Sequence, residues 1–143
     1  MIYSTHMNSC IFCKIASGEI PAEKIFETEH AIAFLDIMPR APGHTMVIPK
    51  IHAENLSDLP REEVGPYFEA CQRATDLIKK ALTPDGFTLG MNYGRVSGQE
   101  VDHLHFHILP RWQGDGGHSL QSVVSNKPTE DVKIIAEKIR KAT

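Results

Sequence analysis

The sequence predicts an α+β fold in which an antiparallel five-stranded sheet packs against one long helix. Five short segments have the alternating or continuous apolar pattern of strands, whereas one long segment has helical spacing. Most links between the strand segments are too short for the crossover that parallel strands need, so an antiparallel sheet is expected. The 143-residue length and the hydrophobic content of 41% suit a single globular domain.

The first part of the chain contains three predicted strands. A short helical turn is expected over residues 10–18, and Pro21 sets the loop that follows it. Residues 24–27 (KIFE) and 31–37 (AIAFLDI) are strand-like and are separated by three polar residues, so they predict a hairpin. A turn-rich stretch then leads to the next strand, 45–50 (TMVIPK).

The second part contains the long helix and the remaining strands. Helical spacing predicts an amphipathic helix over 65–82, and its apolar positions are Phe68, Cys71, Leu77, Ile78, Ala81 and Leu82. A strand over 87–92, a loop over 93–101 and a strand-like run over 102–111 follow. Near the C-terminus, Thr129 is placed to cap a helix with an apolar stripe of Val132, Ile135, Ala136 and Ile139.

The bulk composition excludes several classes of protein. A net charge of -3 gives no basic face for duplex nucleic acid, so no nucleic-acid partner is expected. No apolar run approaches the ~18 residues that cross a bilayer, and the N-terminus lacks the pattern of a signal peptide. Three cysteines are too few for a disulfide scaffold. We therefore expect a cytoplasmic enzyme or small-ligand binder without a membrane partner.

The run DHLHFHILPR, residues 102–111, carries a histidine at every second position. Side chains alternate across a strand, so His103, His105 and His107 share one face, and the apolar side chains between them point to the core. A solvated face would more cheaply use Lys, Glu and Thr. Two interpretations remain: a three-histidine metal site, or nucleophilic and acid–base chemistry on a phosphate.

The run HLHFHIL resembles the His-x-His-x-His-x-x signature, with x apolar, of the histidine triad family of nucleotide-binding proteins. The resemblance extends to FLDI, to APGHTMVIPK, to GMNYG and SGQEV, and to CIFCKI near the N-terminus. It covers roughly Cys10 to Arg111, which is most of the chain. The combination of these segments is far more specific than the three histidines alone.

The resemblance implies hydrolysis of nucleotidyl compounds at the α-phosphate through a covalent nucleotidyl-histidine intermediate. The position of the nucleophile matches His105, and that of a donor to a nonbridging phosphate oxygen matches His107. His44 corresponds to a further histidine near the leaving group. The implied substrate is a nucleoside phosphoramidate or a related adenosine or guanosine monophosphate derivative.

The resemblance also implies a nucleotide site. Asp36 matches a residue that binds the ribose hydroxyls, as acidic residues do in dinucleotide folds. Apolar side chains would wall the base, and these are Phe12, Ile15, Phe34, Leu35 and Ile37. Residues that match phosphate contacts are Asn92, Gly98, Gln99, Glu100 and Val101, where Gly98 lets the backbone approach closely and Gln99 can donate an amide proton.

The pair Cys10-x-x-Cys13 is by itself ambiguous between zinc binding, redox chemistry and chance. Members of the family that keep both cysteines bind a structural zinc, and the other two ligands map to His52 and His103. Two thiolates and two imidazoles make a closed tetrahedral site. The resemblance therefore assigns His103 to a metal and leaves His105 and His107 for the phosphate.

One residue departs from the family pattern. Many relatives have a serine where this chain has Glu100, so a carboxylate replaces a hydroxyl that can help to protonate a leaving group. The negative charge is expected to disfavour polyphosphate leaving groups and to favour cationic amines. The alternatives to a phosphoramidase are a dinucleoside polyphosphate hydrolase, a nucleotide-binding sensor with little turnover, and a catalytic zinc hydrolase.

The expected organisation has three parts: a tail over residues 1–9, the histidine triad domain over 10–112, and an extension with a helix over 113–143. The family also implies a homodimer in which the two sheets become continuous through the long helix and a central strand. The amphipathic pattern of the long helix is compatible with such an interface.

Overall fold

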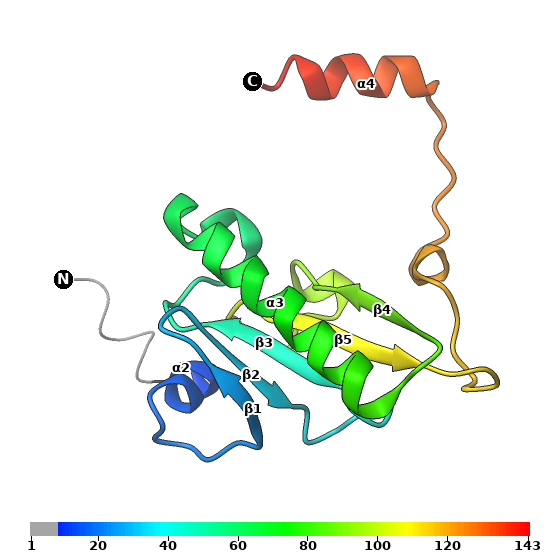
Figure 1. Ribbon diagram of the computed structural model, residues 1–143. Helices are drawn as coiled ribbons and strands as arrows, with labels where there is room; N and C mark the ends of the chain where they lie inside the picture. Colours follow the sequence, from blue (N-terminus) through cyan, green and yellow to red (C-terminus); the bar gives the residue numbers. More distant parts are fainter. Residues whose placement is uncertain (1–8) are drawn as a thin grey trace.

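The computed structural model describes residues 9–143, and its centre is an antiparallel five-stranded sheet (Figure 1). The strand order is β1-β2-β3-β5-β4, so β1 and β4 are the edges. The strands are β1 (Lys24–Glu27), β2 (Ala31–Leu35), β3 (Thr45–Pro49), β4 (Gly86–Gly90) and β5 (Phe106–Arg111). This arrangement confirms the predicted fold class and the predicted hairpin of β1 and β2.

The long helix α3 (Arg61–Leu82) crosses one face of the sheet and contacts β2, β3 and β5 (Figure 1). The prediction that it begins at residue 65 was wrong. Pro66 removes only one backbone hydrogen bond near the helix start, and the first turn carries Glu62 and Glu63, which favour a helix N-terminus.

The buried face of α3 also differs from the predicted one. Cys71 and Ile78 are buried as expected, but Phe68, Leu77, Ala81 and Leu82 are exposed. The helix instead buries Tyr67, Ala70 and Ala74. The two alanines allow close approach to the sheet, and the Tyr67 hydroxyl donates to the carbonyl of Val47 at 2.8 Å. Because of these contacts, the helix packs on the sheet through a different face from the one that the pattern of apolar residues predicts.

The opposite face of the sheet is covered by the short helix α2 (Ile11–Ala16) (Figure 1). Phe12 and Ile15 of this helix pack with Ile32, Phe34 and Ile48 of the sheet in a second apolar cluster, separate from the cluster under α3. The Sγ atom of Cys10 accepts from the backbone N–H of Cys13 and so caps the helix. The sheet therefore lies between two helices, and each helix has its own core.

The histidine run begins before its strand does. Strand β5 starts at Phe106, so His103 and His105 lie in the extended approach to it. The predicted alternation nevertheless holds, because Leu104 and Ile108 belong to the cluster under α3. The rings of His103 and His105 instead contact Phe12 of α2.

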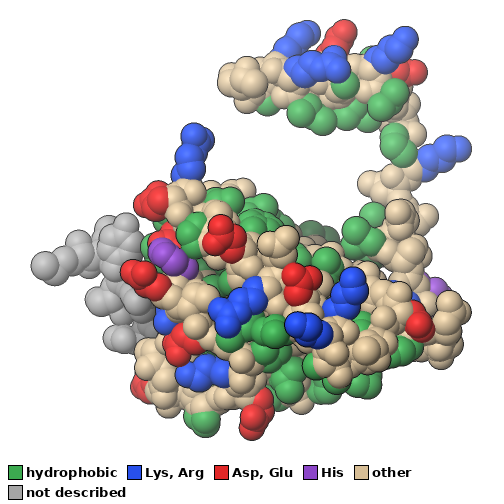
Figure 2. All heavy atoms as spheres, viewed as in Figure 1, with side chains coloured by type: hydrophobic (Ala, Val, Ile, Leu, Met, Phe, Trp, Pro, Cys, Tyr) green, Lys and Arg blue, Asp and Glu red, His purple; other side chains and the backbone are tan. Residues whose placement is uncertain are grey.

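The C-terminal residues form an arm that leaves the end of β5 and carries α4 (Val132–Arg140) away from the body (Figure 1). The predicted cap, Thr129, was wrong: the Asp131 carboxylate accepts from the backbone N–H of Lys133 and begins the helix. In Figure 2 the hydrophobic side chains of α4 gather on the side that faces the body. Val132 and Ile139 in this helix are exposed.

Two further points concern the ends and the surface of the chain. The predicted tail over 1–9 lies outside the described residues apart from Ser9, and the limits at 10–112 and 113–143 stay a prediction. Within residues 9–143, no helix combines the length and the apolar character that a membrane crossing requires.

Candidate active site and metal centre

Two groups of polar side chains lie on the α2 side of the sheet. Cys10 and Cys13 come from the start of α2, His52 follows β3, and His103 precedes β5; their ligand atoms all lie within 4.8 Å of one another. The second group consists of Asp36, His44 and His107, whose ligand atoms also lie within 4.8 Å of one another. Along the chain, His105 lies between His103 of the first group and His107 of the second.

The first group has the spacing of a tetrahedral metal site. The Cys13 Sγ atom lies 3.2 Å from His52 Nδ1 and 3.5 Å from His103 Nδ1, and Cys10 Sγ lies 3.4 Å from His103 Nδ1. Two ligands on a tetrahedral zinc, with bonds of about 2.3 Å to sulfur and 2.0 Å to nitrogen, lie about 3.5 Å apart. The donor set of two thiols and two imidazoles therefore fits zinc.

The backbone fixes which nitrogen of His103 faces the thiols. Its Nε2 lies 2.9 Å from the carbonyl oxygen of Pro49, which can only accept, so Nε2 carries the proton. Nδ1 is then unprotonated and directed at both sulfurs. Burial lowers the pKa of His103 to about 4, so the ring is neutral near pH 7. A neutral imidazole held by a backbone carbonyl is the usual form of a metal-binding histidine.

The Cys13 thiol needs a neighbouring cation to ionise near pH 7. Burial, followed by the hydrogen bond and charge of Cys10, raises the pKa of the Cys13 thiol to about 12. A bound metal ion reverses this balance, because a coordinating thiol is deprotonated. The two cysteines are free of disulfide bonds.

His105 is held in the tautomer that a nucleophile requires. Its Nδ1 lies 2.7 Å from the carbonyl oxygen of His103, so Nδ1 carries the proton and donates it to this bond. The lone pair of the neutral ring is therefore on Nε2. His105 is 7% exposed, and its ring lies 4.9 Å from that of His107, measured between centroids. The middle histidine thus presents an unprotonated nitrogen beside the last one.

A hydrogen-bonded chain sets the proton on His107. The backbone N–H of Arg40 donates to His44 Nδ1 at 3.1 Å, so the proton of a neutral His44 is on Nε2. This Nε2–H lies 3.0 Å from Nδ1 of His107 and donates to it. His107 in its neutral form therefore keeps its own proton on Nε2, where it can donate to a ligand.

Both members of this chain are neutral near pH 7. Burial lowers the pKa of His107 to about 4, and the neighbouring His105 and His44 lower it further than Asp36 raises it. Burial is also the main cause that lowers the pKa of His44. Asp36 Oδ2 lies 3.6 Å from His44 Nε2. A neutral donor of this kind stabilises phosphate charge through a hydrogen bond rather than through a full positive charge.

The same hydrogen bonds argue against a metal ion in the second group. A metal on Nε2 of His44 would require the proton on Nδ1, where it would oppose the N–H of Arg40. The three histidines of the run therefore do not form one metal site, because His103 faces the thiols and His107 faces His44.

The predicted base-wall residues separate into two sets. Phe12, Ile15 and Phe34 are buried in the cluster under α2, whereas Leu35 is 39% exposed and Ile37 is 90% exposed. Asp36, the predicted ribose ligand, uses Oδ1 to accept from the backbone N–H of Met38, which leaves Oδ2 directed toward His44.

The predicted phosphate-contact residues form a loop beside the histidines. Gly98 has a φ of +105°, a backbone conformation that favours glycine, although a Cβ there would make only an ordinary contact with the Asn92 side chain. Val101 packs against the cluster that contains Phe12. Glu100 is exposed, and Arg95 donates to its carbonyl oxygen.

Gln99 is engaged elsewhere. Its side-chain amide donates to the carbonyl of Glu54 at 2.8 Å, and its side-chain oxygen accepts from the backbone N–H of Gly94. The residue is 4% exposed. In this structure Gln99 therefore holds the loop together, and the second proton of its amide is left for the predicted phosphate contact, which stays a prediction.

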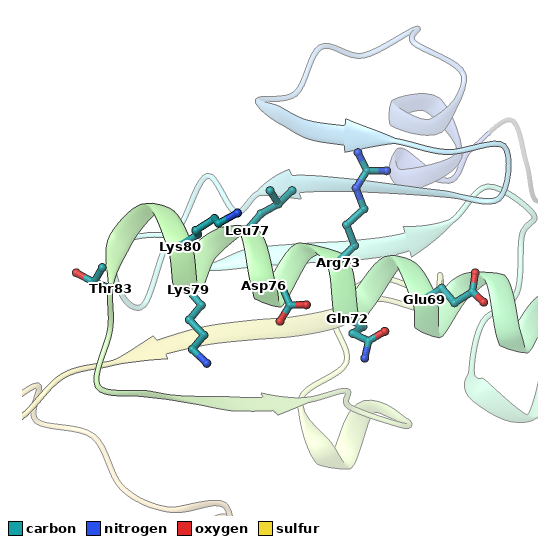
Figure 3. A pocket seen from close by; sticks show the side chains of 8 residues that line it. All are labelled: Glu69, Gln72, Arg73, Asp76, Leu77, Lys79, Lys80 and Thr83. Atoms are coloured by element: carbon teal, nitrogen blue, oxygen red, sulfur yellow. The ribbon is translucent and has the colours of Figure 1, made fainter.

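A surface hollow of about 720 Å³ lies on the other side of the sheet (Figure 3). Its lining comes from α3 and the residue after it: Glu69, Gln72, Arg73, Asp76, Leu77, Lys79, Lys80 and Thr83. Because the imidazoles face α2, this hollow has no part in their chemistry.

Comparison with known proteins identifies the family. A HIT domain matches residues 17–114. An uncharacterized HIT-like protein of Methanocaldococcus jannaschii is 50% identical over 107 residues, 75% of this chain and 82% of its own. An adenosine 5'-monophosphoramidase of Schizosaccharomyces pombe is 38% identical over 131 residues, covering 92% and 96% of the two chains.

Solved structures give the same result. The crystal structure of a HIT family protein from Bacillus subtilis matches with a TM-score of 0.84 and 38% identity, over 94% of this chain and 97% of that one. A zinc-bound histidine triad family protein from Mycobacterium smegmatis matches with a TM-score of 0.71 and 32% identity, over 96% and 99%. The chain belongs to the HIT, or histidine triad, family.

Sequence reasoning missed the backbone groups that fix the imidazoles. The carbonyls of Pro49 and His103 and the N–H of Arg40 set the tautomers of three histidines. No residue type signals such a role, because every residue except proline carries the same two backbone groups. Only the pairing of the segments in space shows them.

The buried, neutral His107 predicts a loss of stability in acid. Its pKa is about 4 in the folded chain against an ordinary 6.5, so between these values the unfolded chain binds a proton that the folded chain does not. This contribution to the free energy of unfolding is fully present above about pH 6.5 and is lost as the pH falls toward 4. We expect His107→Gln to reduce this loss by roughly 2 kcal/mol in urea titrations.

His118→Gln, which changes an exposed histidine of the arm, is the matched control. Parallel stability curves for wild type and His107→Gln across pH 7 to 4 would contradict the assignment.

Proposed function

We propose that this protein hydrolyses nucleoside phosphoramidates, or related nucleotidyl compounds, at the α-phosphate through a nucleotidyl-histidine intermediate. The observation that carries the proposal is the hydrogen bond from His105 Nδ1 to the His103 carbonyl, because it leaves the Nε2 lone pair for attack. The likeness to a phosphoramidase of Schizosaccharomyces pombe supports the same reaction class.

The reaction has two displacements. The Nε2 lone pair of His105 attacks the α-phosphorus, a bond from phosphorus to the histidine forms, and the bond to the leaving amine breaks as the amine takes up a proton. The Nε2–H of His107 donates to a nonbridging oxygen. Water then attacks the phosphorus, the bond to His105 breaks, and the nucleoside monophosphate leaves. The proton that the water loses passes to solvent and balances the proton that the amine took from solvent in the first step. Asp36 holds the ribose, and the apolar residues near α2 contact the base.

His105→Ala tests the nucleophile. We expect wild type to release AMP from an adenosine phosphoramidate and the variant to lose at least about 10³-fold in kcat, since the proposed intermediate forms on Nε2 of His105. AMP binding, measured by calorimetry, should persist. His30→Ala, which alters a histidine paired with Glu63 away from the site, is the control.

Wild type that binds AMP but releases none from the phosphoramidate would favour the alternatives, a dinucleoside polyphosphate hydrolase or a nucleotide sensor. Equal turnover by His105→Ala would contradict the covalent mechanism.

We also propose that Cys10, Cys13, His52 and His103 hold a structural zinc. The distances and the fixed His103 tautomer support this proposal, as does the zinc-bound relative from Mycobacterium smegmatis. Four protein ligands leave no position for water, so the ion would stabilise α2 and the approach to β5. The three free cysteines suit a reducing compartment such as the cytoplasm.

Metal removal tests this site. The purified protein should carry one zinc per chain, and a chelator should lower its Tm by about 10 °C, because a structural metal contributes several kcal/mol. Cys13→Ala should lose the zinc, whereas Cys71→Ala, a buried cysteine outside the cluster, should keep it. A metal-free protein with a Tm insensitive to chelator would contradict the proposal.

Substitution of Glu100 tests whether its charge affects which leaving group the protein accepts. Its exposed carboxylate should repel an anionic polyphosphate, so Glu100→Ser should raise turnover of dinucleoside polyphosphates about fivefold, equivalent to ~1 kcal/mol. Asp102→Asn, which neutralises a nearby exposed acid paired with Arg95, is the control. Unchanged turnover by Glu100→Ser would remove the role assigned to this charge.

We further propose a homodimer with a continuous sheet. Phe68 and Leu77 on α3 are each 38% exposed, and Leu89 on the edge strand β4 is 40% exposed. A second copy seated on these residues would cover apolar surface and pair the open edge of the sheet.

A further inference from the structure

Phe12 lies between the metal-binding group and the nucleophile. It is 6% exposed, and it follows Cys10 and precedes Cys13 in the turn that presents both sulfurs. Its ring centroid is 5.2 Å from that of His105, with the two planes at 79°, and 6.0 Å from that of His103, at 80°. One side chain therefore contacts a metal-binding imidazole and the nucleophilic imidazole edge to face.

The orientation of the His105 ring depends on packing contacts of this kind. The Nδ1 bond to the His103 carbonyl fixes the proton, but the torsion that turns an imidazole about its Cβ–Cγ bond has a broad minimum. Packing must therefore limit the rotation of the ring. Phe12 is itself fixed from behind by Phe34, whose ring lies 5.7 Å away at 71°. Ring contacts therefore connect Phe34 of the sheet, Phe12 and His105 in a continuous series.

The backbone gives a second connection between the same two groups. His103 directs Nδ1 at the sulfurs, and its own carbonyl oxygen accepts from His105. Any shift of α2 or of His103 therefore reaches the nucleophile by two routes, one through the Phe12 ring and one through the backbone.

We propose that Phe12 is a positioning residue for His105 and couples the placement of helix α2 by its cysteine pair to the orientation of the nucleophile. The kinetic part of this inference rests on the proposed function, whereas the orientation of the ring does not. The metal-binding group then acts on the reaction only through this chain's own side chains and backbone and needs no contact with the substrate.

The proposal differs from the role of Phe12 as a wall for the base. A wall residue presents a free face to its ligand, whereas Phe12 is 6% exposed and its ring contacts Phe34, His103 and His105. Loss of a wall weakens binding and raises KM. Loss of a positioning contact lowers kcat, because a small displacement of a reacting atom is costly in rate.

The test compares Phe12→Leu with Ile32→Val. Ile32 is fully buried in the same apolar cluster, but it lies on β2, which β3 separates from β5, so its variant reports the effect of a weakened core. Zinc content and Tm are measured for both. The ¹⁵N signals of the His105 ring, recorded without nucleotide, report its tautomer and its exchange between orientations.

We expect wild type and Ile32→Val to show one sharp Nδ1-protonated form of His105. Phe12→Leu should keep its zinc but show broadened or averaged His105 signals, with kcat about tenfold lower and KM within twofold. Wild type treated with a chelator should show the same change in the His105 signals.

Three results would overturn the inference: unchanged His105 signals in Phe12→Leu, a rise in KM with kcat intact, or equal effects of both variants. Failure of wild type to turn over a phosphoramidate would instead count against the proposed function, and the ¹⁵N comparison would still decide the role of Phe12.

Discussion

The site depends on the way His103 is held on three sides. Its Nε2 donates to the Pro49 carbonyl, its Nδ1 faces two sulfurs, and its backbone oxygen accepts from His105. The first bond selects the nitrogen that meets the thiols, and the third selects the nitrogen of His105 that stays free. A single fully buried residue thereby orients both the proposed zinc ligands and the proposed nucleophile.

Burial keeps the imidazoles of His103 and His107 neutral. Removing His103 and His107 from water disfavours their charged forms and lowers each pKa to about 4. Neutral rings have one donor and one acceptor nitrogen, so the fixed partners of one nitrogen determine the role of the other. A chain of neutral imidazoles from Arg40 through His44 to His107 can therefore present a donor to a phosphate without placing net positive charge inside the protein.

One face of the sheet holds the larger core, and the other holds the histidines. The α3 side holds the larger core, which the Tyr67 bond to Val47 and the small residues of the helix bring close to the sheet. The α2 side has a smaller core in which aromatic and imidazole rings share contacts. Because the histidine run alternates between these faces, Leu104 and Ile108 anchor the same segment whose histidines face the site. Packing on one side thus limits movement of the groups on the other.

The sequence by itself determined the alternation of the histidine run, the presentation of both cysteines by one helical turn, and the antiparallel sheet, because each follows from a local period or a short link. The tertiary structure alone decided the tautomers, which depend on backbone groups of Pro49, His103 and Arg40 that carry no sequence signal. It also decided the buried face of α3 and the hydrogen bond from the Gln99 side chain to the Glu54 carbonyl. These features depend on which segments meet in space, and no residue pattern within one segment specifies its partner.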